Sequence, residues 1–109
     1  MASLTFRTAI VACLVSLCPV FPVTAQEKPA EVHIDNFAFT PAEITVSPGT
    51  TITWENRDDI PHNVVASDKT FRSKVMDTEQ KFSFTFGSPG VYEYFCALHP
   101  HMKGKVIVK

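Results

Sequence analysis

Short runs of alternating apolar and polar residues fill the sequence from Glu31 to the C-terminus, and they constrain the fold more than any other feature. Turn residues such as proline and glycine separate several of the runs, and no helical period continues over ten residues. A two-residue period indicates strands that bury one face. Six or more such strands can be traced within about 80 residues, which is typical of compact β domains. We therefore expect an all-β fold, an antiparallel β-sandwich or a small barrel.

The predicted strands place their apolar residues on one face. Residues 43–56 contain two apolar pairs around a Ser-Pro-Gly turn and predict a hairpin. Residues 81–86 and 90–96 predict two further strands, and the C-terminus predicts a last one. Residues 67–80 are the least regular part, and we expect a loop there with at most one short strand. The side chains expected to face inward are Val32, Ile34, Ile44, Val46, Ile52, Trp54, Phe82, Phe84, Phe86, Tyr92, Tyr94 and Cys96.

Residues 1–25 differ from the rest of the chain. Arg7 is followed by an uncharged, mostly apolar run of about 16 residues that gives way to polar sequence after Ala25. This arrangement is typical of a secretory signal peptide, and the run is too short and too broken by prolines for a membrane-spanning helix. Cys13 follows a small residue, as in a lipoprotein signal, but it lies too close to Arg7 to leave an apolar core. We expect export to the periplasm, with no membrane span in the mature protein.

Residues 26–109 predict a single domain, because about 84 residues can enclose only one small core. The full chain has 10 Lys and Arg residues against 11 Asp and Glu residues and contains no basic run, so we expect no nucleic-acid partner. Cys13 and Cys18 fall in the predicted signal peptide, which leaves Cys96 as the only cysteine of the mature chain. Small exported domains without disulfides need a bound metal or dimerisation for stability. We expect a monomer whose thiol is protected by a metal.

The segment YFCALHPHM, residues 94–102, gathers several side chains that can bind metals. Cys96 ends a predicted strand and shares its face with two tyrosines, so its sulfur should point between the sheets. His99 and Met102 follow at steps of three, which suits a tight loop that folds back over the sulfur. His62 begins an apolar segment after a proline-bearing loop and is placed to supply a fourth donor.

The chemistry of these donors favours copper. A thiolate and two imidazoles with a more distant thioether form the ligand set of a blue-copper electron-transfer site. Zinc prefers four firm tetrahedral donors, which a thioether does not supply well, and an iron–sulfur cluster requires several cysteines. Cys96 by itself could be a small buried apolar residue, as free cysteines often are. The neighbouring donors favour a metal ligand, and the predicted cofactor is one type 1 copper ion, Cu(I)/Cu(II).

The sequence resembles the cupredoxins, and within them most closely the amicyanins. The resemblance covers nearly all of the mature chain: FTPAEITVSPGTTITWEN is similar to the N-terminal strands, PHNVV to the first ligand strand, and GVYEYFCALHPHMKGKVIVK to the ligand loop and last strand. The Cys-x-x-His-x-x-Met spacing is that of the short amicyanin loop. The resemblance implies a Greek-key β-sandwich, and it implies that the copper ligands are His62, Cys96, His99 and Met102.

Two residues depart from the amicyanin pattern. Leu98 stands where amicyanins have a proline before the loop histidine, and His101 stands where they have a phenylalanine before the methionine. Both changes leave the ligands intact but put the particular partner in doubt. We expect His101 to face solvent at the rim of the site. Asn63 is expected to tie the His62 segment to the ligand loop through its side-chain amide.

The predicted function is that of a periplasmic electron carrier that shuttles single electrons between redox proteins and is not an enzyme. The resemblance implies a periplasmic amine dehydrogenase as donor and a c-type cytochrome as acceptor, which would dock transiently. An apolar rim around the exposed edge of His99 would suit such docking, and its expected members are Pro61, Met76, Leu98 and Pro100. The alternatives are a copper-binding or copper-delivery protein without redox turnover and a metal-free scaffold. A cysteine protease that uses Cys96 is disfavoured, because the thiol should face the core rather than a cleft.

Overall fold

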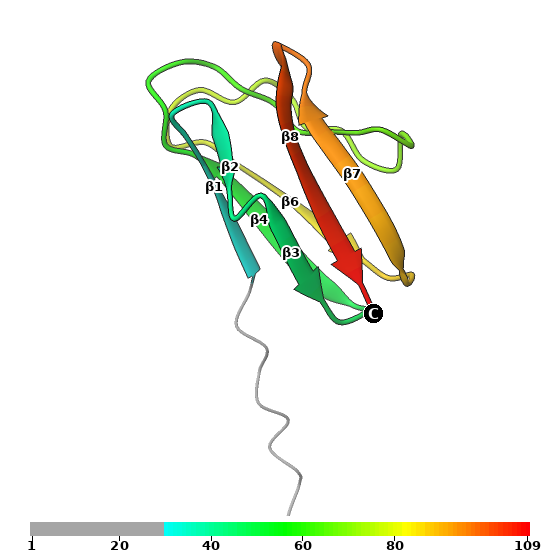
Figure 1. The fold of residues 1–109 in the computed structure, drawn as a ribbon. Coiled ribbons are helices and arrows are strands. Elements are labelled where there is room, and N and C mark those ends of the chain that lie inside the picture. Colours follow the sequence, from blue (N-terminus) through cyan, green and yellow to red (C-terminus); the bar gives the residue numbers. More distant parts are fainter. Residues whose placement is uncertain (1–29) are drawn as a thin grey trace, which may run out of the picture.

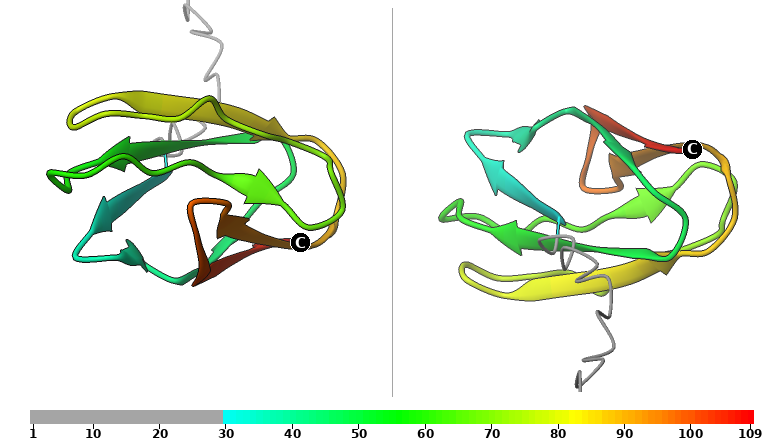
Figure 2. Two further views of the ribbon diagram at one scale, coloured as in Figure 1. Left: turned by 90° about the horizontal axis from the view of Figure 1, so that it is seen from above. Right: turned by 90° about the horizontal axis from the view of Figure 1, so that it is seen from below.

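Across residues 30–109, eight strands form two four-stranded sheets that pack face to face (Figures 1 and 2). This computed structural model describes residues 30–109, so the predicted signal peptide lies outside the described residues. No helical segment that could span a membrane occurs among these residues. The strands are β1 (Ala30–Asp35), β2 (Ala38–Thr40), β3 (Glu43–Val46), β4 (Thr50–Asn56), β5 (Val65–Ala66), β6 (Lys81–Phe86), β7 (Gly90–Cys96) and β8 (His99–Val108).

The strand order confirms the predicted all-β sandwich but not a purely antiparallel one. One sheet has the order β2-β1-β4-β6 and the other β3-β8-β7-β5. Two of the pairs, β1 with β4 and β3 with β8, run parallel. The chain leaves the first sheet after the β1–β2 hairpin, passes through β3 in the second sheet and reverses into β4. Because of these reversals, β4 returns beside β1 in the same direction.

The predicted hairpin over residues 43–56 is wrong, although its turn is correct. Gly49 has a left-handed φ of 91°, and the Thr50 N–H donates to the Ser47 carbonyl over 3.2 Å. The two strands on either side of this turn lie in different sheets, where β3 pairs with β8, and β4 pairs with β1 and β6. Both strands bury apolar residues, so the alternation alone does not distinguish a hairpin within one sheet from a crossing between two.

Aromatic rings fill the space between the sheets. Trp54 of β4 and Tyr94 of β7 are almost fully buried, and their rings meet edge to face across the sandwich at 5.5 Å. Burial raises the pKa of Tyr94 to about 12, so this phenol stays neutral at ordinary pH. The Tyr94 ring also lies over Gly104 of the neighbouring strand, and a Cβ at position 104 would overlap it. Close packing of this kind holds the strand that ends at Cys96 in one place.

Three connections meet at the same end of the sandwich, opposite the C-terminus (Figure 1). They are the turn between β1 and β2, the long connection between β4 and β5, and the short turn between β7 and β8. His62 lies on the second of these connections, Cys96 and His99 flank the third, and Met102 follows within β8. Segments far apart in the sequence therefore converge at this end.

Candidate metal centre

Three of the four predicted donors come together at this end of the molecule. Cys96 is the last residue of β7 and His99 the first of β8, while His62 lies in the connection between β4 and β5. Their ligand atoms all lie within 4.8 Å of one another. His62 and Cys96 are fully buried, and His99 is only partly buried. Cys96 points inward because it follows Tyr92 and Tyr94 on the same face of β7, as predicted.

The distances between the donors suit a shared metal ion. The Cys96 Sγ lies 3.7 Å from the His62 Nδ1 and 3.7 Å from the His99 Nδ1. A metal bound to sulfur at about 2.3 Å and to nitrogen at about 2.05 Å separates these atoms by about 3.5–3.8 Å at angles of about 109–120°. The separations are therefore those expected around one trigonal or tetrahedral ion, and both imidazoles present the same ring nitrogen.

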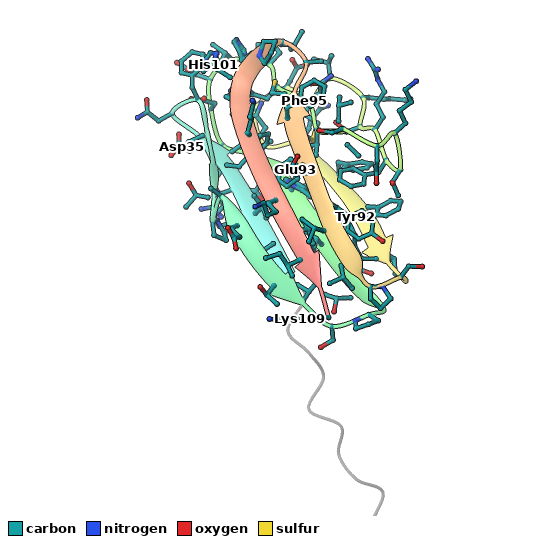
Figure 3. All side chains as sticks on the ribbon, turned by 45° about the vertical axis from the view of Figure 1, so that its right-hand side comes forward. Asp35, Tyr92, Glu93, Phe95, His101 and Lys109 are labelled. Carbon is teal, nitrogen blue, oxygen red and sulfur yellow. The ribbon has the colours of Figure 1, made fainter. Side chains whose placement is uncertain are left out.

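Met102 reaches the same interior from β8. It is 3% exposed and belongs to the buried cluster that contains Cys96. The tight loop that was expected to carry His99 and Met102 is shorter in the structure, because β8 already begins at His99 and only Ala97 and Leu98 lie between the strands. In this strand Met102 is buried while its neighbour His101 is exposed, which confirms the predicted solvent-facing position of His101. Figure 3 shows His101 at the end of β8 opposite Lys109.

The His62 ring is oriented by a carboxylate that was not predicted from the sequence. The His62 Nε2 lies 2.8 Å from the Asp58 Oδ2, in a buried contact. The Phe37 N–H donates to the same oxygen over 3.1 Å. The hydrogen bond from Phe37, followed by that from His62, lowers the pKa of the Asp58 carboxyl. An ionised acceptor at Nε2 keeps the ring proton on that nitrogen and leaves the Nδ1 lone pair facing the sulfur.

The segment that carries Asp58 and His62 has its own frame of hydrogen bonds. The Asn56 Oδ1 accepts from the Asp58 N–H over 2.9 Å. The Asn56 amide donates to the carbonyls of Ile60 and Met76, each over 2.9 Å. His62 and Met76 also form a β-bridge, with N–H to carbonyl distances of 3.1 and 2.7 Å. Asn56 is fully buried, so each of these bonds replaces contacts with water.

Asn63 joins the two segments of the site. Its Oδ1 accepts from the Ala97 N–H over 2.7 Å, which confirms the predicted tie between the His62 segment and the turn after Cys96. Its own N–H points at the Cys96 Sγ over 3.5 Å. A backbone donor on a thiolate stabilises the negative charge of the sulfur and weakens its electron donation to a metal. Asn63 therefore positions the turn through its side chain and stabilises the negative charge of the sulfur through its backbone N–H.

The rim differs from the prediction in one member. Met76 is 3% exposed and lies in the core, so it is not part of the surface. Phe37 takes this place instead: it is 47% exposed, and its ring meets those of His62 and His99 edge to face at 5.8 and 5.1 Å. Leu98 is exposed to the same extent. Phe37 was missed because both histidines lie far from it in the sequence, so no local pattern connects them.

The position of Phe37 depends on the tight turn between β1 and β2. Asn36 and Phe37 have φ values of 50° and 57°, a left-handed pair that is typical of two-residue hairpin turns. Phenylalanine is rare in this region of backbone space. The bond from its N–H to Asp58 holds it there. Asp58 thus fixes both a donor ring and the aromatic ring that covers it.

Comparison with known proteins gives one consistent result. Residues 26–109 match the profile of the family described as copper binding proteins, plastocyanin/azurin family. Amicyanin of Paracoccus versutus is 38% identical over 96 residues, which cover 81% of this chain and 73% of that protein. Halocyanin of Natronomonas pharaonis is 46% identical over 83 residues, which cover 69% of this chain and 50% of that protein.

Solved structures agree with the sequence matches. A purple cupredoxin from Nitrosopumilus maritimus superimposes with a TM-score of 0.71 and 32% identity, covering 73% of this chain and 99% of that one. The oxidised M98L mutant of amicyanin gives a TM-score of 0.70 and 35% identity, covering 74% of this chain and 82% of that one. The predicted resemblance to cupredoxins, and to amicyanins among them, is confirmed.

Proposed function

Because this chain belongs to the plastocyanin/azurin family of copper-binding proteins, we propose that it is a periplasmic blue-copper electron carrier. We assign the copper ligands to the His62 Nδ1, the Cys96 Sγ, the His99 Nδ1 and the Met102 thioether. The observation that carries this assignment is the pair of 3.7 Å separations between the sulfur and the two imidazole nitrogens. When bound, copper supplies reversible one-electron chemistry, and the set of one thiolate, two imidazoles and a weak thioether is suited to it.

The protein's own residues hold this donor set in place. Asp58 orients the His62 ring, and Asn63 ties the turn after Cys96 to the His62 segment. The sandwich supplies a rigid base for both, since Cys96 ends a strand that is paired on both sides with β5 and β8. Donors that are already positioned need little rearrangement when the charge of the site changes, and a carrier needs that property to exchange electrons quickly.

The exposed side of the site is the side of His99. Both His62 and Cys96 are fully buried, whereas His99 is only partly buried and lies under the rim formed by Phe37 and Leu98. Electrons would therefore enter and leave at the outer edge of the His99 ring. The apolar rim suits brief contacts with redox proteins, and the proposed partners are an amine dehydrogenase as donor and a c-type cytochrome as acceptor.

The proposed carrier is a single domain over residues 26–109, exported by a signal peptide over residues 1–25, and it has no substrate of its own. A copper-delivery protein is the main alternative. Such a protein would be expected to hold copper through exposed ligands that release it, whereas Cys96 and Met102 are buried here.

Addition of Cu(II) to the purified protein tests the function. We expect an intense visible charge-transfer band from thiolate to copper that disappears on reduction and returns on oxidation. Cys96→Ser should remove the band completely while the β-sheet circular dichroism persists. A pale spectrum without the intense band would support storage or delivery instead, and an unchanged band in the Cys96→Ser protein would refute the ligand assignment.

A further inference from the structure

A cationic hollow lies beside the His62 segment of the candidate metal centre, because Met76, which pairs with His62, is one of its lining residues. It encloses roughly 730 Å³ between the segment that follows β5 and the start of β6. No Asp or Glu residue is among its lining residues, which are Arg72, Ser73, Lys74, Val75, Met76, Gln80, Lys81 and Phe82. The full chain has a formal net charge of −1. The lining of this hollow is therefore positively charged, whereas the chain as a whole is slightly negative.

Most of the positive charges of this hollow are not neutralised by ion pairs within the described residues. Among residues 30–109, neither Arg72 nor Lys74 takes part in an ion pair. Lys81 lies 3.3 Å from the partly buried Glu55 carboxylate, but the Lys81 side chain is 59% exposed, and water weakens such a surface pair. Two unpaired cations and one weakly paired cation produce a local positive potential, which attracts negatively charged surfaces.

The floor of the hollow is joined directly to the metal-site frame. Met76 lines the hollow, and its N–H donates to the His62 carbonyl over 2.7 Å. The Met76 carbonyl accepts from the His62 N–H and from the buried Asn56 amide. A partner seated in the hollow would therefore lie one hydrogen-bonded residue away from His62. This route is distinct from the exposed edge of His99.

We propose that the hollow lined by Arg72, Lys74 and Lys81 is a second docking surface, and that its occupant is the acidic surface of a redox protein. The inference rests on the proposed electron-carrier function. Val75, which is 51% exposed, and the half-buried Phe82 add apolar area among the cations. Arginine and aromatic side chains of this kind are enriched in protein interfaces. Nucleic acid fits less well, because the cations are few and the chain as a whole is slightly acidic.

The surface can be tested by NMR with an acidic peptide as the probe. The ¹⁵N-labelled, Cu(I)-loaded protein is titrated with a ten-residue poly-L-glutamate at low salt. We expect amide shifts confined to residues 72–76 and 80–82 and reversed by added salt, because the Debye length falls to about 10 Å at 0.1 M. Arg72→Glu/Lys74→Glu should weaken binding at least about tenfold.

A charge-matched control separates local from overall electrostatics. Lys103→Glu/Lys105→Glu changes the net charge equally but on the outer face of β8, and it should leave the affinity within about twofold of the unmodified protein. Equal weakening by both double variants, or shifts centred on β7 and β8, would overturn the docking surface. An equal response to a single-stranded DNA of matched charge would overturn the acidic-protein assignment in favour of a general polyanion site. Absence of the visible copper band would refute the proposed function, whereas a normal band without shifts at residues 72–82 refutes only this surface.

Discussion

The two segments that bring donors to the candidate centre are held in different ways. The segment from Asn56 to Asn63 is fixed by buried side chains that bond to distant backbone, as when the Asn56 amide reaches Met76. The turn between β7 and β8 is fixed mainly by strand pairing, and its residues Ala97 and Leu98 are exposed. The first segment therefore orients the His62 donor through buried hydrogen bonds, while the second has Cys96 and His99 at its ends and presents the site to the surface.

This contrast indicates which changes each segment tolerates. The first segment has little freedom, because an altered side chain there leaves buried polar groups without partners. The turn and the start of β8 can vary in their outward residues, and both departures from the amicyanin pattern lie there, Leu98 in the turn and His101 in β8. Changes to partner choice can thus occur without loss of the donor set.

The largest expected effect comes from breaking the first segment at Asp58. Asp58→Ala removes the acceptor for both the His62 ring and the Phe37 N–H. We expect copper affinity to fall about 10–100-fold, which is typical when the outer partner of a ligating histidine is lost. Competition titration with a copper chelator measures this. Asp59→Ala, at the exposed neighbouring position, is the matched control, and an equal loss in both variants would contradict the role of Asp58.

A smaller effect is expected from cutting the tie between the two segments. Asn63→Ala removes the bond to the Ala97 N–H, and we expect the free energy of unfolding of the copper-free protein to fall by about 0.5–1.5 kcal/mol. Urea denaturation followed by circular dichroism gives this value. Thr85→Ala, which removes an exposed hydroxyl pair with Thr51, should cost less than about 0.5 kcal/mol. If the Thr85 variant loses as much unfolding free energy, the bond from Asn63 to Ala97 stabilises the protein no more than an exposed hydroxyl pair does.

The smallest effect on copper is expected at the outward face of β8, close to its start. His101→Phe replaces an exposed imidazole, and we expect the visible band to keep its position and intensity, with copper affinity within about twofold. His99→Phe, two residues earlier, should abolish the intense band because it removes a donor. Spectra of the two variants side by side test which imidazole binds, and loss of the band in the His101 variant would reverse the assignment.

Much of the fold and of the candidate site could be predicted from the chain alone. The alternation in residues 81–86 and 90–96 predicted both strands correctly, and it predicted that Cys96 faces inward. The pairing of β3 and β4 was predicted wrongly. Alternation indicates which face of a strand is buried, but it does not indicate which strand pairs with it.

The sequence by itself determined the period-two strands, the set of soft donors and their spacing, because these depend on side-chain type and on neighbours a few residues away. Only the tertiary structure decided that Asp58 meets the His62 ring, that Phe37 covers the site and that two strand pairs run parallel. Contacts such as that of the Phe37 N–H with Asp58 join residues more than 20 positions apart. They form only once strands distant in the sequence lie side by side, so local pattern cannot encode them.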